Sequence, residues 1–290
     1  MTVALGLDIG GSKTKALCCT GTVTVHESVA GSANVASVGL AEASRQLDAV
    51  LAEMPCEAIE SVCAGTAGTP QTARQITDLL QRRFPHAKLL VVHDSQLILA
   101  AAGAEDGIAL IAGTGSVAWG KRGERTVRVG GWGHLLGDEG SAYWVGQQAV
   151  RHALSRVDHG LAADSLTRAI TAACGLADPA ALLDHFYELH DRRYWAQRAS
   201  VVFDQARGGD EVGRRIVTAA AAALTGLTAE VGRQLGIDGP VVLAGGLAVH
   251  QPMLQEEIRK FLSRNDVRVL DVEPVHGAIR LAQREMSCPS

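Results

Sequence analysis

Two features near the N-terminus could support chemistry: one carboxylate and a turn that contains two glycines. Asp8 ends an apolar run, and the segment 10–14 follows it with the sequence Gly-Gly-Ser-Lys-Thr. Backbone N–H groups in such a turn can approach phosphate oxygens closely, because glycine has no Cβ to block them. The residues predicted to bind phosphate in this turn are Gly10, Gly11, Ser12, Lys13 and Thr14.

Asp8 has the chemistry of a magnesium ligand. Mg²⁺ binds carboxylates and phosphates and keeps several of its waters, so a carboxylate beside a phosphate turn suits it. We therefore expect Asp8 to hold a Mg²⁺ ion through a water molecule. The alternative is an ordinary hairpin with Gly10 and Gly11 at its tip and a solvated Asp8.

The segments after this turn decide which kind of phosphate site the sequence can form. Residues 14–19 and 23–29 are mostly apolar or β-branched and are separated by a turn, which predicts two strands rather than a helix. Gly6 and Gly11 have the spacing of a Walker loop, but Ser12 stands at the lysine position and no helix follows. The Rossmann fingerprint fails for the same reason, so a glycine hairpin between strands is expected.

A second glycine turn repeats this plan farther along the chain. Gly113, Thr114 and Gly115 lie between the predicted strands 107–112 and 116–120, and residues 126–129 form a third alternating segment. A duplicated plan of this kind predicts two similar lobes, each offering a glycine hairpin to one cleft. A third junction, Gly245-Gly246, follows the apolar strand 240–244, and its glycines would let adenine and ribose lie against the backbone.

Two polar residues elsewhere are candidates for contact with a second substrate. Asp94 follows the apolar strand 88–92, and ligands of open α/β sheets collect at the carboxyl ends of strands. We therefore expect Asp94 and Asp8 to lie at adjacent strand ends and to form the acidic floor of a site. The alternative for Asp94 is a helix N-cap. Asn34 lies in a loop of turn-forming residues, where it either binds a sugar hydroxyl or only shapes the turn.

The segment 130–144 holds five glycines, two acids, a histidine and two tryptophans. Because glycine density costs backbone entropy, we expect a functional loop rather than a core strand or an ordinary helix. Trp132 could lie against the apolar face of a sugar ring, and Asp138 could bind hydroxyls or a metal. We interpret His134 as a structural hydrogen-bonding residue rather than a base.

The periodicity of apolar residues predicts the helices and strands that position these residues. The pattern predicts an α/β fold with helices at 39–54, 70–83, 96–103, 141–156 and 278–286, a helical region to Gly236, and strands at 58–64, 88–92 and 267–270. We expect one lobe from residues 1–106 and 274–290 and another from residues 107–273.

Composition excludes several classes of function. The 290 residues carry a formal net charge of −4, and their short basic runs give no sign of nucleic-acid binding. Six cysteines without a C-x-x-C pair indicate neither a zinc site nor a disulfide framework. No signal peptide or membrane span is predicted, so we expect a cytoplasmic protein that does not bind membranes.

Taken together, these motifs resemble a known superfamily. Segments 8–14, 112–116 and 243–246 look like the two phosphate motifs and the adenosine motif of the actin, hexokinase and Hsp70 ATPases. The segments 31–34, 93–95 and above all 130–141 resemble the N-acetylglucosamine kinase branch of the BadF/BadG/BcrA/BcrD group, which also holds glucosamine kinases. This resemblance covers essentially the whole chain and implies two ribonuclease-H-like lobes around an ATP and sugar cleft, the second lobe enlarged by helices.

The resemblance implies a role for each motif residue. Asp94 would be the base that faces the sugar 6-hydroxyl, Trp132 would wall the pocket, and the turn 113–116 would hold phosphate and sugar. The implied cofactors are ATP and Mg²⁺, and we expect a homodimer. The implied sugar-binding residues are Asn34, Asp94, Gly115, Ser116, Trp132 and Asp138, and those that bind ATP in the second lobe are Gly113, Thr114, Gly115, Gly245 and Gly246.

These expectations leave three alternatives. The start Asp8-Ile9-Gly10-Gly11 also resembles ROK sugar kinases, but the cysteine-rich zinc motif of that family is absent. The acceptor could instead be glucose or another hexosamine such as N-acetylmuramic acid. The same ATPase scaffold also serves as the activator of radical dehydratases, which needs cysteines around an iron–sulfur cluster, an arrangement that Cys18, Cys19, Cys56 and Cys63 do not offer.

Overall fold

A computed structural model describes residues 3–54, 58–188 and 191–287, so Cys56 and Cys288 lie outside the described residues. The chain divides into two compact units. Lobe 1 comprises Met1–Glu105 and Leu270–Ser290, and lobe 2 comprises Asp106–Val269.

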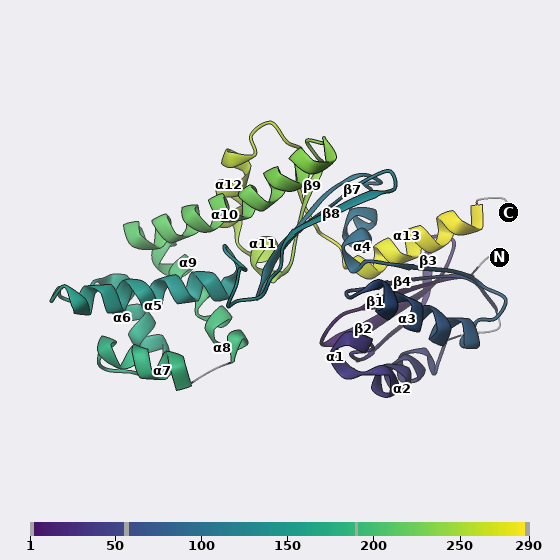
Figure 1. Cartoon of the computed structure of the whole chain (residues 1–290), viewed down its shortest axis with the longest axis horizontal. Coiled ribbons are helices and arrows are strands. Elements are labelled where there is room, and N and C mark those ends of the chain that lie inside the picture. Colours follow the sequence, from purple (N-terminus) through teal and green to yellow (C-terminus); the bar gives the residue numbers. More distant parts are fainter. Residues whose placement is uncertain (1–2, 55–57, 189–190, 288–290) are drawn as a thin grey trace. The chain divides into compact units, whose positions relative to one another are not determined.

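Lobe 1 is built on a mixed five-stranded sheet of order β3-β2-β1-β4-β5 (Figure 1). β1 (Val3–Ile9), β2 (Lys13–Thr20) and β3 (Val23–Gly31) form an antiparallel meander, whereas β4 (Ile59–Thr66) and β5 (Lys88–Val92) run parallel to β1. Strand β1 is almost entirely buried, as its apolar sequence predicts for a central strand. The sheet therefore delivers the carboxyl ends of β1, β4 and β5 to one edge.

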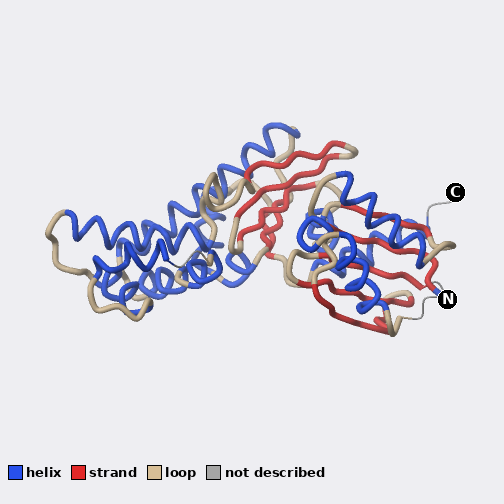
Figure 2. The backbone as a smooth tube through the Cα atoms, turned by 60° about the horizontal axis from the view of Figure 1, so that its bottom comes forward, coloured by secondary structure: helices blue, strands red, loops and turns tan. Residues whose placement is uncertain are grey.

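Helices cover both faces of this sheet (Figure 2). Leu47 of α2 (Leu40–Leu51) and Ile76 of α3 (Pro70–Arg83) belong to one hydrophobic cluster, and the short α1 (Val35–Val38) precedes α2. Leu97 of α4 (Asp94–Ala101) and Ala278 of α13 (Pro274–Ser287) belong to a second cluster, which lies against the other face. The C-terminal helix thus returns to complete lobe 1.

Lobe 2 repeats the strand plan in the order β10-β9-β6-β7-β8. β6 (Gly107–Ala112), β7 (Ser116–Arg122) and β8 (Arg125–Gly130) are antiparallel, and β9 (Val241–Ala244) and β10 (Val267–Val269) are parallel to β6. The predicted duplication is confirmed: each lobe has the ribonuclease-H-like strand order that the actin-like ATPase fold contains twice.

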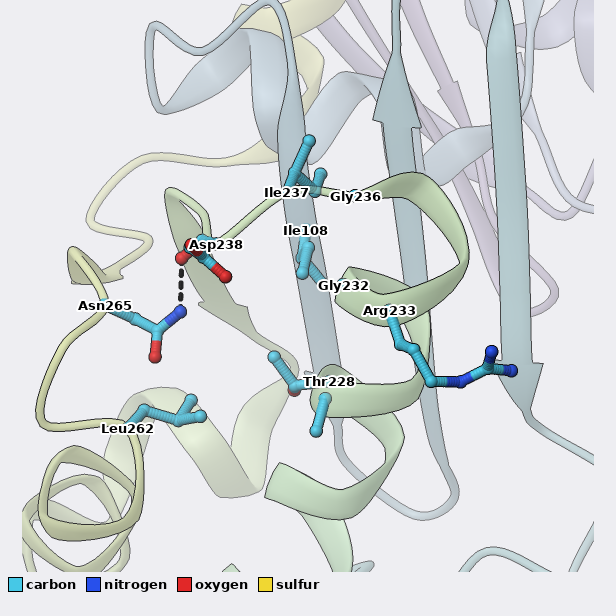
Figure 3. Close-up of a pocket in the computed structure, with 10 residues that line it drawn as sticks. Ile108, Thr228, Gly232, Arg233, Gly236, Ile237, Asp238, Leu262 and Asn265 are labelled. Carbon is cyan, nitrogen blue, oxygen red and sulfur yellow. Dashed lines mark hydrogen bonds between the residues drawn. The ribbon is translucent and has the colours of Figure 1, made fainter.

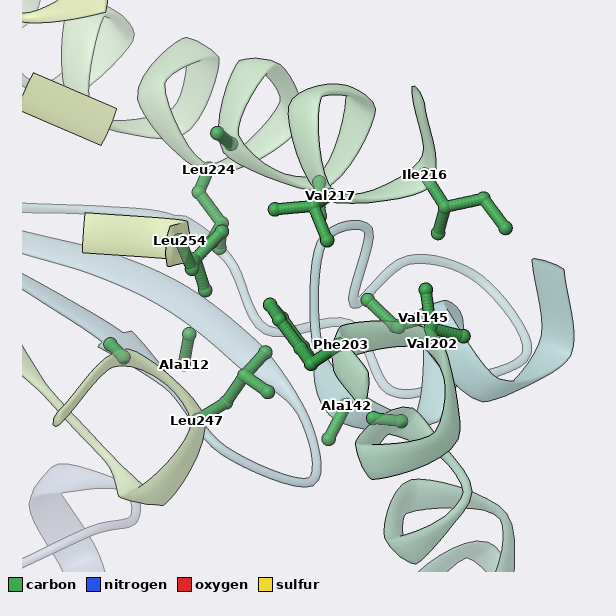
Figure 4. Packing of buried hydrophobic residues seen from close by; sticks show 14 of the residues in the cluster. Ala112, Ala142, Val145, Val202, Phe203, Ile216, Val217, Leu224, Leu247 and Leu254 are labelled. Atoms are coloured by element: carbon green, nitrogen blue, oxygen red, sulfur yellow. The ribbon is translucent and has the colours of Figure 1, made fainter. Parts of the chain in front are cut away.

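Helices enlarge lobe 2 between β8 and β9, as expected. Phe203 points into a core to which Val217 and Leu247 also contribute (Figure 4). Gly236 adopts a left-handed conformation (φ 67°) and ends α10, as the sequence predicts. The helices are α5 (Ala142–Asp158), α6 (Ser165–Ala173), η2 (Pro179–Ala181), α7 (Leu182–Glu188), α8 (Arg192–Gln197), α9 (Ala199–Arg207), α10 (Glu211–Leu235), α11 (Gly246–His250) and α12 (Pro252–Phe261).

Some element boundaries differ from those predicted. Helix α4 begins at Asp94 rather than at residue 96, because His93 caps it, and α13 begins at Pro274 rather than at residue 278. Proline is well tolerated in the first helical turn, where its missing N–H has no intrahelical partner. Among the described residues, no helix combines the length and apolar character that crossing a bilayer requires.

Candidate active site

In lobe 1, the first glycine turn is a tight connection between β1 and β2. The N–H of Gly10 donates to the carbonyl oxygen of Lys13 at 3.0 Å. Ser32 donates to the carbonyl oxygen of Gly10, and the buried Thr14 accepts from the N–H of Ala33, so the loop after β3 braces the turn. Thr14 thus has a structural role in addition to the phosphate contact that we predict for it.

Neither glycine of this turn has a left-handed backbone conformation. A Cβ on Gly11 would lie 3.6 Å from the nearest atom, the hydroxyl oxygen of Ser37, which is an ordinary contact. The fold of the hairpin therefore does not require glycine at position 11. Space kept open beside backbone N–H groups is what a bound phosphate needs.

Asp8 lies within β1, opposite Lys15 on β2 and Gly65 on β4. Burial, and then the charge of Asp94, raise the pKa of Asp8 to about 6, against the lowering effect of Lys13. The ionised carboxylate is thus destabilised where it stands, and a bound cation would relieve this. No group of three metal-ligating side chains occurs among the described residues, but Mg²⁺ needs only one or two carboxylates when waters and phosphates supply the other ligands.

Asp94 is the first residue of α4, and its side chain is not the N-cap. His93 occupies that position, and its Nδ1, when it carries no proton, accepts from the N–H of Ser95. Burial favours the neutral carboxyl of Asp94, but hydrogen bonds from His93 and Ser95 and the charge of His93 outweigh it, so the pKa of Asp94 lies below its ordinary value. The alternative that Asp94 merely caps the helix is therefore wrong, and Asp94 is held as a carboxylate.

Asp8, near the end of β1, and Asp94, just after β5, belong to strands that are not neighbours, because β4 lies between these strands. The expectation of adjacent strand ends is incorrect in this respect, since sequence order does not reveal that β4 enters the sheet beside β1. The charge of Asp94 nevertheless acts on Asp8. Their surroundings push the two pKa values in opposite directions, as is common for carboxylates with different tasks in one site.

Asn34 is buried and shapes the loop after β3. Its side-chain oxygen accepts from the N–H of Ala36, which makes it the N-cap of α1, and its amide nitrogen donates to the carbonyl oxygen of Ala67 at 3.1 Å. Asn34 thus has a structural role in this loop. Its amide has a second N–H, so the proposed contact with a sugar remains compatible with these bonds.

In lobe 2, the second glycine turn lies directly beside the third. The N–H of Gly113 donates to the carbonyl oxygen of Gly115, and a Cβ on Gly113 would lie 3.7 Å from the nitrogen of Gly246. Gly245 has a φ of 85°, and a Cβ there would approach the carbonyl oxygen of Ala112 to 2.6 Å, so only glycine fits at this crossing. Two turns that are far apart in sequence therefore meet in lobe 2.

A pocket of about 470 Å³ opens at these turns. Gly113, Thr114 and Gly246 form part of its wall, and most of the rest comes from helices α8 and α9, together with Ala142, Leu247 and Gln251. Nothing in the sequence singles out the polar residues that these helices and Gln251 contribute, because they look like ordinary surface positions. They are Arg193, Gln197, Ser200 and Gln251.

Another pocket of lobe 2 is unrelated to these turns. It has a volume of about 450 Å³ and lies where the end of α10 faces Ile108 and Asn265 (Figure 3). None of its lining residues belongs to a glycine turn.

Asp138 is buried against the second turn. A Cβ on Gly115 would lie 2.6 Å from Oδ2 of Asp138, so the absence of a side chain at Gly115 makes room for this carboxylate. Asp138 has a φ of 61°, a conformation that costs energy in a residue other than glycine and that is common at functional sites. Ser116 donates to the carbonyl oxygen of Glu139 at 2.8 Å and ties the turn to the same loop.

The glycine-rich loop after β8 presents Trp132 to solvent. The indole is 70% exposed, and the guanidinium of Arg128 lies 5.6 Å from its centroid. His134 packs edge-on against Tyr143, which agrees with a structural rather than a catalytic histidine. An exposed indole on a folded loop is available for stacking on a ligand.

Comparison with known proteins agrees with this picture. The model of the BadF/BadG/BcrA/BcrD ATPase family matches residues 5–282. An N-acetylmuramic acid/N-acetylglucosamine kinase of Clostridium acetobutylicum is 32% identical over 98% of this chain and 99% of its own length. An N-acetyl-D-glucosamine kinase of Dictyostelium discoideum is 29% identical over 77% of this chain and 75% of its own.

Solved structures support the fold. A Chromobacterium violaceum protein, solved as a candidate N-acetylglucosamine kinase, has a TM-score of 0.74 and 23% identity over 98% of this chain and 99% of that one. A ROK family glucokinase from Streptomyces griseus, solved with glucose and AMPPNP, has a TM-score of 0.58 and 15% identity over 97% and 98%. From the extent of the family match and the full-length relative, the chain belongs to the BadF/BadG/BcrA/BcrD ATPase family.

Proposed function

We propose that this protein is an ATP-dependent amino-sugar kinase that phosphorylates the 6-hydroxyl of N-acetylglucosamine or glucosamine. The observation that carries the proposal is Asp94, a carboxylate held ionised at the end of β5 by His93 and Ser95 rather than used as a helix cap. The match to the clostridial kinase along the full length of both chains supports this choice of substrate class.

Asp94 is the base in this proposal. Its ionised carboxylate orients the acceptor hydroxyl and takes its proton as the bond to phosphorus forms. The nucleotide occupies the pocket beside Gly113 and Gly246, and backbone N–H groups of the glycine turns stabilise the charge on the phosphates. Asn34, Gly115, Ser116, Trp132 and Asp138 are the residues that we propose to bind the sugar.

Magnesium has a candidate ligand in Asp8. Burial and neighbouring carboxylates raise the pKa of Asp8, and a divalent cation would lower it again by stabilising the ionised carboxylate. The residue therefore fits a Mg²⁺ ion held through water. The ion would neutralise charge on the phosphates of ATP. Cytoplasmic location and a homodimer also remain proposals.

The acceptor sugar needs a direct test. Initial rates with ATP and glucosamine, N-acetylglucosamine, N-acetylmuramic acid and glucose should give the highest kcat/KM for glucosamine or N-acetylglucosamine. A preference for N-acetylmuramic acid, which the name of the clostridial relative makes the second candidate, would change the substrate but not the reaction. Lack of phosphorylation of all four sugars would refute the proposal.

The role of Asp94 is tested by Asp94→Asn. Because His93 caps α4, the substitution should leave the thermal midpoint close to that of the wild type. An amide cannot accept the proton, so kcat should fall by about 10²- to 10⁴-fold while the sugar still binds. A variant that loses only two- or three-fold in kcat would remove Asp94 from the mechanism and favour Asp138 instead.

A further inference from the structure

The imidazole of His93 contacts both the backbone of α4 and the carboxylate of Asp94. Its Nδ1 lies 3.0 Å from Oδ1 of Asp94, 3.0 Å from the hydroxyl of Ser95 and 3.3 Å from the N–H of Ser95. A single ring nitrogen cannot donate and accept at once. When it carries a proton it can donate to Asp94, and when it does not it accepts from Ser95.

Two side chains contact the same carboxylate oxygen of Asp94. Ser95 donates its hydroxyl to Oδ1 of Asp94 at 3.4 Å, and Nδ1 of His93 approaches that oxygen as well. Two partners on Oδ1 restrict rotation of the carboxylate and direct Oδ2 away from them. We propose that His93 is a positioning residue that, with Ser95, holds Oδ1 of Asp94 so that Oδ2 faces the acceptor hydroxyl.

This proposal rests on the role of Asp94 as the base in the proposed function. Capping alone does not explain a histidine here, because serine, threonine, aspartate and asparagine are the preferred N-caps. When Nδ1 carries a proton, the imidazole, charged or neutral, donates to the carboxylate, and the tautomer without that proton accepts from the helix instead. The base is then pre-oriented by α4, whose Ser95 and Leu97 are buried and keep the start of the helix in place.

The contact also acts on the charge of Asp94. Burial would raise the pKa of this carboxyl, and the bond and charge from His93 keep it below its ordinary value. His93 thus helps to keep Asp94 an acceptor, which a group that receives a proton from a hydroxyl must be.

His93→Asn separates the two roles of the imidazole. Asparagine is a good N-cap, so α4 should be retained, but it cannot become a cation beside Asp94. We expect a thermal midpoint close to that of the wild type, KM values for ATP and sugar within about twofold, and kcat lower by about tenfold or more, since a charge-assisted hydrogen bond is lost. The control is His86→Asn, the same change at an exposed histidine of lobe 1, which should alter none of these values.

A double-mutant cycle shows whether His93 acts through Asp94. In the Asp94→Asn background, His93→Asn should cause little further loss of kcat, because the group that it positions is already gone. A full additional tenfold loss in that background would overturn the proposal. Unchanged kcat in the single His93→Asn variant would overturn it as well.

Nitrogen NMR of the imidazole gives a test that does not depend on activity. At pH 8, Nδ1 of His93 should carry a proton in the wild type and lose it in Asp94→Asn, where no carboxylate favours that tautomer. The same Nδ1 signal in both proteins would refute the contact. If this signal changes as expected but no sugar is phosphorylated, the proposed function fails while the link between His93 and Asp94 stands.

Discussion

Replacing Asp8 by asparagine should make the free protein more stable while removing its activity. Burial first, and then the charge of Asp94, raise the pKa of Asp8 from 3.8 to about 6 in the folded state. The folded chain therefore holds a proton that the unfolded chain releases, and the stability of the wild type falls as pH rises through this window. Asparagine has nearly the same shape and no charge to desolvate.

The size of the effect follows from this shift. At 1.36 kcal/mol for each pKa unit, the change from 3.8 to about 6 destabilises the folded wild type by about 3 kcal/mol above pH 7. At pH 4.5 the unfolded carboxyl is mostly ionised and the folded one is still mostly protonated, so the penalty is about 1 kcal/mol. Below pH 3.8 both states are largely protonated and the difference disappears.

Urea unfolding measures this directly. The free energies of unfolding of wild type and Asp8→Asn should differ by about 3 kcal/mol at pH 8 and by about 1 kcal/mol at pH 4.5. The control is Asp78→Asn, which neutralises an exposed carboxylate of α3 and should change stability by less than about 0.5 kcal/mol at both values. ATP turnover by Asp8→Asn should be strongly reduced, because the candidate magnesium ligand is lost.

Two outcomes would refute this reasoning. If Asp8→Asn is no more stable than the wild type at pH 8, its carboxylate is not under strain in the folded protein. If the gain in stability is equal at pH 4.5 and pH 8, its cause is not the ionisation of Asp8. Addition of Mg²⁺ should stabilise the wild type but not the variant, as expected for a ligand that binds only the native state.

Three further predictions concern other parts of the molecule. Gly115→Ala should lower kcat/KM for the sugar, because the added Cβ would approach Asp138 to 2.6 Å. The control is Gly226→Ala, whose Cβ would have no atom within 4 Å and which should leave activity unchanged. Equal kinetics of the two variants would show that the position of Asp138 does not matter for activity. ATP and sugar together should reduce the radius of gyration in small-angle scattering, since lobe closure excludes water that would hydrolyse ATP, and identical curves would contradict closure. Protein purified without oxygen should be colourless, because Cys18, Cys19, Cys63 and Cys174 are all buried, whereas a brown preparation with iron and sulfide would favour the dehydratase-activator alternative.

Much of the fold could be predicted from the sequence because its signals are local. Strand β5 (Lys88–Val92) and helix α3 (Pro70–Arg83) have the predicted bounds, since an apolar run and an apolar stripe with Pro70 at the start depend on neighbouring residues only. The glycine turns were recognisable for the same reason, as short breaks between apolar strands. The repeat of three strands then indicated two lobes.

Tertiary structure decided how residues far apart in sequence act on one another. Three features depend on packing across a lobe: the place of β4 between β1 and β5, the contact between the Gly113 and Gly246 turns, and the polar residues of α8 and α9 in the pocket beside those turns. The sequence alone determined that Asp8 and Asp94 are carboxylates at strand ends. Which of them holds a proton more readily depends on burial and on the nearest charges, and these exist only in the folded chain.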